Sequence, residues 1–65
     1  MTPTETAAIR RLDTWRLAWI IRDNPTYIAS LRRTHPADTD WEAEIALYEE
    51  EIRIAKDELA RRGEL

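Results

Sequence analysis

The residue types that carry out most enzymatic chemistry are scarce in this sequence. Its 65 residues include no cysteine, one histidine, His35, and one serine, Ser30. A catalytic nucleophile needs a base within hydrogen-bond reach, and a zinc site needs several Cys or His ligands. The sequence lacks the residues for either kind of site. His35 precedes Pro36 in a segment with the composition of a surface loop, and no glycine-rich phosphate loop is present. We therefore expect a non-enzymatic protein with no cofactor and no bound metal.

Three acidic side chains share a spacing that can form a row of carboxylates. Glu44, Glu51 and Glu58 follow one another at intervals of seven residues. Divalent cations bind oxygen ligands gathered from several positions. Because the chain offers no second row of ligands, a solvated helix face is the favoured interpretation. A cation site completed by a symmetric oligomer is the alternative.

The charges divide unevenly along the chain. Residues 1–35 hold six arginines and three acids, a net charge of +3, whereas residues 36–65 hold ten acids and four basic residues, a net charge of −6. We expect these segments to attract each other, either within one chain or between two chains.

The arginines of the first half make DNA or RNA the main alternative class of partner. Arginine binds phosphate groups, and a dimer would gather many arginines on one side. However, the run Glu49-Glu50-Glu51 in the last helix would be repelled by phosphates, which argues against a helix-turn-helix reader. The same run suggests another alternative, an acidic mimic of nucleic acid. The candidate nucleic-acid contacts are Arg10, Arg11, Arg22, Arg32 and Arg33.

The elements that position these side chains are predicted to be helices. Strong helix formers dominate the sequence and only one glycine is present, which favours a single all-α domain over residues 1–65. Thr2 and Pro3 are typical of a helix start, so the first helix should span about 3–22. Pro25 lacks an N–H donor and disfavours the helical conformation at Asn24. We expect a break or kink there and a short helix over about 25–33.

The last helix, over about 40–62, carries the clearest pattern. Thr39 and Glu42 match a capping box, and Gly63 is typical of a helix end. Ion pairs are expected at a spacing of four, between Glu49 and Arg53, Asp57 and Arg61, and Glu58 and Arg62. The apolar positions repeat as in a coiled coil or helical bundle, and they are Trp41, Ile45, Tyr48, Ile52, Ala55 and Leu59.

Two tryptophans fall on the apolar stripe of the first helix. Ala8, Leu12, Trp15 and Trp19 repeat at intervals of 4, 3 and 4 residues, so both tryptophans are predicted to lie in the core. A role for them at a membrane surface is the less favoured interpretation.

Several apolar residues lie away from these main stripes. A single antiparallel hairpin cannot bury them together with the main stripes, so we interpret them as part of a protein interface. A homodimer with a bundle-like core is the favoured architecture, and a monomeric three-helix bundle is the alternative. The predicted interface residues are Leu17, Ile21, Leu47, Glu50 and Ile54.

Together these observations predict a small helical interaction module that associates with itself and with an unknown protein partner. The longest apolar run, Leu17 to Ile21, is far shorter than the roughly 20 residues needed to cross a bilayer, so we expect no membrane partner and a cytoplasmic location. Nine of the ten basic residues are arginine, which is typical of a GC-rich coding sequence. A bacterial, phage or mobile-element accessory protein is the expected setting.

Overall fold

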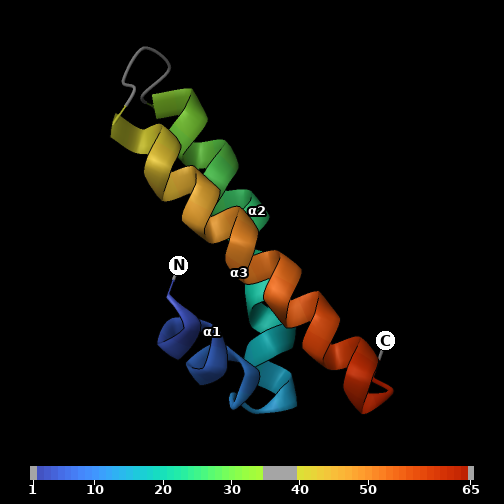
Figure 1. The fold of residues 1–65 in the computed structure, drawn as a ribbon. Helices are drawn as coiled ribbons and strands as arrows, with labels where there is room; N and C mark the ends of the chain where they lie inside the picture. Colours follow the sequence, from blue (N-terminus) through green and yellow to red (C-terminus); the bar gives the residue numbers. More distant parts are fainter. Residues whose placement is uncertain (1, 35–39, 65) are drawn as a thin grey trace.

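Three helices make up almost all of the chain that the computed structural model describes, residues 2–34 and 40–64. Helix α1 spans Pro3–Arg10, α2 spans Thr14–Thr34 and α3 spans Asp40–Arg62. α2 and α3 run antiparallel along their lengths, and α1 folds back beside them and packs on α3 (Figure 1). The all-α class is therefore confirmed.

The first helix begins as predicted but ends twelve residues early. The Thr2 side chain accepts a hydrogen bond from the Glu5 N–H, and Pro3 occupies the first turn. The predicted helix over 3–22 is wrong, because α1 ends at Arg10 and α2 begins at Thr14. The Asp13 carbonyl accepts hydrogen bonds from the N–H groups of Arg16 and Leu17. Asp13 thus precedes the first turn of α2, a position where aspartate is favoured.

This break has a packing cause. It lets α1 turn back so that Ile9 and Leu12 pack against the buried residues shared by α2 and α3. A continuous helix over 3–22 would have carried Ile9 away from that core. The burial of apolar surface therefore favours two helices where the periodicity alone indicated one.

Of the two outcomes predicted at Pro25, the break into a separate short helix is wrong, because α2 continues through Pro25 as one helix of 21 residues. The kink stays a prediction. Pro25 cannot donate to the Ile21 carbonyl, which costs about 3 kcal/mol in a helix interior. Contacts on both sides offset that loss. Ile28, one turn beyond the proline, is buried against α3, and the Asn24 side chain bonds to α3.

The core forms two clusters along the contact between α2 and α3. Near α1, the buried residues Leu17, Ala55 and Leu59 are covered by Ile9, Leu12, Ile20 and Ile21. Towards the other end, Ile28, Leu31 and Ile45 are covered by Trp41, Tyr48 and Ile52. The predicted apolar seam of α3 is thus confirmed, with all six of its members buried or partly buried.

Asn24 lies between the two clusters and joins α2 to the middle of α3. Its Nδ2 donates to the Tyr48 carbonyl at 3.3 Å and to Glu51 Oε1 at 3.0 Å. Beside it, the rings of Tyr27 and Tyr48 meet edge to face with centroids 5.0 Å apart. A polar residue within an apolar seam fixes how two helices align, because any shift would leave its hydrogen bonds unmade.

The end of α3 agrees with the sequence. Gly63 has a φ of +76°, and the N–H of Glu64 bonds back to the Leu59 carbonyl at 2.8 Å, which closes the last turn. The predicted capping box at Thr39 and the loop containing His35 lie outside the described residues.

The molecule is a flat slab rather than a sphere. Its principal extents are 39, 23 and 13 Å, and its Cα radius of gyration is 12.7 Å. A typical compact chain of this length has a radius of gyration of about 10.7 Å. α3 is contacted by both other helices, whereas the side of α2 that faces away from α3 is left exposed.

Candidate protein interface at Trp15 and Trp19

The two tryptophans of α2 lie on the surface. Trp15 is 58% exposed and Trp19 is 55% exposed, so their predicted place in the core is wrong. The helix break at residues 11–13 separates them from the stripe that begins at Ala8. Within α2 the buried side is set by Leu17, and Trp15 lies about 160° around the helix from it.

The sequence contains a signal for this orientation that the stripe through the tryptophans obscured. The residues of α2 that face α3 repeat at intervals of 4, 3, 4 and 3, the same heptad pattern as the seam of α3. The inner face of α2 is formed by Leu17, Ile21, Asn24, Ile28 and Leu31, each buried or partly buried. A polar residue within this run made the pattern less conspicuous than the stripe through the tryptophans.

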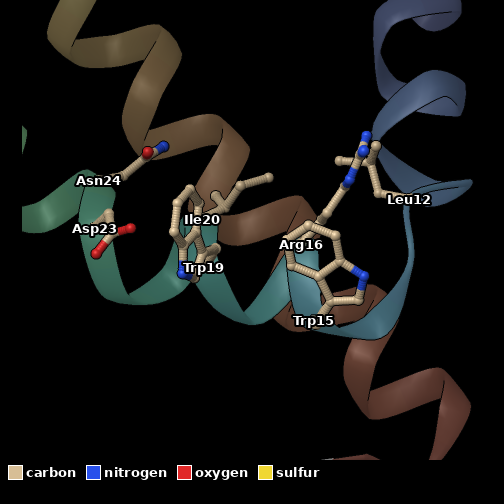
Figure 2. A pocket seen from close by; sticks show the side chains of 7 residues that line it. All are labelled: Leu12, Trp15, Arg16, Trp19, Ile20, Asp23 and Asn24. Atoms are coloured by element: carbon tan, nitrogen blue, oxygen red, sulfur yellow. The ribbon is translucent and has the colours of Figure 1, made fainter.

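An open groove of about 450 Å³ runs beside the tryptophans on the outer side of α2 (Figure 2). Indole rings and aliphatic side chains form most of its wall, and charged groups stand along it. Leu12, from the turn before α2, closes one end. The lining residues are Leu12, Trp15, Arg16, Trp19, Ile20, Asp23 and Asn24. We call this surface the tryptophan groove.

Arginines hold both indole rings in place. The Arg16 guanidinium carbon lies 5.2 Å from the centroid of the Trp15 ring, and that of Arg22 lies 5.7 Å from the Trp19 ring. The two indoles meet edge to face, with centroids 6.4 Å apart and ring planes at 75°. Such cation–π and edge contacts each contribute about 0.5–1 kcal/mol at exposed sites. Such contacts favour these ring orientations, and a side chain already held in one orientation loses less entropy on binding.

Asp23 adds a negative charge to this surface. Its Oδ1 accepts a hydrogen bond from Arg22 Nε at 3.1 Å, and both side chains are mostly exposed. The groove thus carries the cationic Arg16 and the anionic Asp23 seven residues apart, both lining the same cavity. Neither residue belonged to the predicted interface.

The predicted interface residues do not form one surface. Leu17 and Ile54 are fully buried within the single chain, so the prediction that they await a partner is wrong. Ile21 is partly buried against the core cluster beside α1. Ile9 of α1 and Leu12 help to cover the cluster that contains Leu17, and a two-helix hairpin would lack that cover. Leu47 stays 39% exposed.

Glu50, the last predicted interface residue, is engaged within α3. Arg53 donates two hydrogen bonds to its carboxylate, and these bonds lower the pKa of Glu50. They likewise raise the pKa of the Arg53 guanidinium. Both groups remain ionised near neutral pH, so an interface through Glu50 would have to accommodate the pair.

Three of the five candidate nucleic-acid contacts form ion pairs. Arg10 Nη2 lies 3.5 Å from Asp57 Oδ2, and Arg32 Nη2 lies 3.2 Å from Glu49 Oε1. Arg22 pairs with Asp23, as described above. Arg11 and Arg33 have no ion-pair partner among residues 2–34 and 40–64. The predicted attraction between the two halves of the chain is confirmed by the first two pairs, which join α1 and α2 to α3.

The ion pairs along α3 differ in part from those predicted. Of the three predicted pairs, Glu58–Arg62 is present, with Nε and Oε2 2.9 Å apart. Arg53 and Arg61 instead pair with Glu50 and Glu58, each three residues earlier. Carboxylates that can reach an arginine on a neighbouring helix do so, which the spacing along one helix cannot reveal.

The row of carboxylates on α3 is likewise divided among separate partners. Glu51 accepts the hydrogen bond from Asn24, and Glu58 pairs with Arg61 and Arg62. Within the described part of the chain no three His, Cys, Asp or Glu side chains gather as a metal site would require. Burial and a hydrogen bond with Tyr27 raise the pKa of Tyr48, which leaves its hydroxyl neutral at physiological pH.

Comparisons of the chain with protein-family models, with curated proteins and with solved structures find no match. Among the described helices, none combines the length and the apolar content that crossing a bilayer requires.

Proposed function

We propose that this chain is a non-enzymatic protein interaction module that binds a protein partner through the tryptophan groove. One observation carries the proposal: two indoles, each more than half exposed, stand beside an open apolar groove and are ordered by arginines. Tryptophan and arginine are the residues most enriched where protein interfaces gain their affinity.

The exposed indole surface is large for a chain of this size. A fully exposed tryptophan presents up to about 250 Å², so the exposed fractions correspond to about 280 Å² for Trp15 and Trp19 together. Exposed apolar patches of a few hundred Å² commonly mark binding surfaces. At about 25 cal/mol per Å², covering both rings would contribute roughly 7 kcal/mol before the costs of association.

Affinity capture from the cells that make the protein tests this proposal. The bait is the tagged chain, its Trp15→Ser/Trp19→Ser variant, or a Leu47→Ser control, which removes an exposed apolar side chain elsewhere. We expect a protein retained by the unaltered chain and by the control but lost by the double variant. Equal retention by all three baits, or no retained protein at all, would contradict the proposal. Circular dichroism verifies that the variants keep their helices.

Nucleic acid remains the second candidate because of one feature of the same groove. Exposed indoles flanked by Arg16 and Arg22 can stack unpaired bases and neutralise phosphates. Against it, Asp23 and the acidic α3 oppose a phosphate backbone. Titration with a single-stranded oligonucleotide at low salt separates the two: quenching of tryptophan emission that disappears as salt rises would favour nucleic acid.

A further inference from the structure

We propose that the partner in the tryptophan groove is a second copy of the chain, docked with its α2 antiparallel to the first. This inference rests on the proposed function, since it names the protein that the groove binds. The charges of the groove and its apolar residues support it.

The arrangement of charge is self-complementary under a two-fold rotation. Arg16 and Asp23 line the same groove seven residues apart, about 10.5 Å along the helix axis. A two-fold axis perpendicular to α2, passing between Trp19 and Ile20, brings residue 16 of one copy level with residue 23 of the other. Each copy would then place its Arg16 opposite Asp23 of the second copy, giving two identical ion pairs.

The opposite orientation is disfavoured by the same residues. In a parallel pair of α2 helices, Arg16 would face Arg16 and Asp23 would face Asp23. Like charges brought together at an interface cost binding energy and select against that arrangement. The antiparallel dimer therefore follows from the order of the two charges along α2.

The apolar residues fall where such a dimer needs them. Trp19 lies next to the two-fold axis, so the two copies of this indole would meet at the centre of the interface. Trp15 would lie to one side, at the level of Asn24 from the second copy, which lines the same groove. Leu12 and Ile20 extend the apolar surface along the groove.

The exposed indoles supply nearly half of the area that a small stable interface buries. Exposed indole surface from both copies amounts to about 560 Å², and specific interfaces bury about 1,200–2,000 Å² in total. The remaining surface of α2, a helix of 21 residues, is available to supply the difference.

Charge exchange at the two positions tests this dimer by sedimentation velocity over a range of concentrations. We expect the unaltered chain to dimerise and the single variants Arg16→Asp and Asp23→Arg each to weaken dimerisation by about tenfold or more, because each brings like charges together twice. Mixing the two single variants should restore dimers, because their heterodimer pairs aspartate with arginine at both contacts. Arg33→Asp, an equal charge change at the far end of α2, is the control and should leave dimerisation unchanged.

Several results would overturn the inference. They are a chain that stays monomeric up to about 1 mM, single variants that dimerise as the unaltered chain does, and a mixture of variants that stays monomeric. A blue shift of tryptophan emission with anionic vesicles, absent on raising protein concentration, would assign the groove to a lipid surface instead. Circular dichroism of each variant separates lost docking from lost folding.

These outcomes are distinct from failure of the proposed function. If the chain is monomeric but the Trp15→Ser/Trp19→Ser variant loses a captured protein, the groove binds a different partner and only the dimer fails. If neither capture nor self-association depends on the tryptophans, the proposed function itself fails.

Discussion

Replacing Pro25 with alanine should stabilise this protein. The proline lies inside α2, where it leaves the Ile21 carbonyl without its helical donor. Alanine restores that donor and is the most favourable residue in a helix interior, where the difference from proline is about 3 kcal/mol. The proline side chain is exposed, so little packing is lost on its removal.

The expected gain is smaller than the full helix penalty. Alanine leaves the unfolded chain more freedom than proline does, which returns about 0.4–1 kcal/mol. The free energy of unfolding should therefore rise by about 2 kcal/mol. For a domain of this size that corresponds to an increase of about 10 °C in Tm.

Urea unfolding followed by circular dichroism at 222 nm measures this change, at one fixed protein concentration so that any dimerisation is held constant. Pro3→Ala is the matched control. Pro3 occupies the first turn of α1, where backbone N–H groups have no helical carbonyl to bond to. The Pro3→Ala substitution should therefore change the free energy of unfolding little. If Pro25→Ala gives no gain or destabilises the chain, α2 is not continuous and a separate helix begins at residue 25.

Two further pairs of substitutions test the buried core and the contact of Asn24 with α3. Leu17→Ala should reduce the free energy of unfolding by about 3 kcal/mol, because the side chain is fully buried. Leu47→Ala, at an exposed side chain, should reduce it by less than about 1 kcal/mol. Similar losses in urea unfolding would refute the assignment of Leu17 to the core. Asn24→Asp should destabilise the chain by about 2 kcal/mol or more at pH 7, because it sets a carboxylate against Glu51 and loses the donor to Tyr48. Adding Glu51→Gln should recover part of that loss, and a double-mutant cycle without coupling would refute the contact.

Much of the fold could be read from local patterns. The start of α1 at Thr2 and Pro3, the end of α3 at Gly63 and the apolar seam of α3 were all predicted correctly, because each depends on residues close together in one helix. The attraction between the basic and acidic segments was also predictable, since it depends on net charge.

The candidate site could not be predicted in the same way. Two heptad-like stripes compete within α2, one through Trp15 and Trp19 and one through Leu17 and Ile28, and they lie on opposite sides of the helix. Periodicity shows that each stripe could face a partner but does not show which one does. The choice was settled by α1 turning back at residue 11 and by α3 taking Asn24 as a hydrogen-bond donor.

The sequence by itself therefore determined the helical class, the start of α1, the end of α3 and the inward face of α3. Tertiary structure alone decided the break before Asp13, the continuity through Pro25 and the exposure of the tryptophans. The physical reason is that each of these features has a local free-energy cost, such as a lost hydrogen bond or an exposed ring. That cost is offset by the burial of apolar surface against residues far away in the chain. Only the packed molecule brings both sides of that balance together.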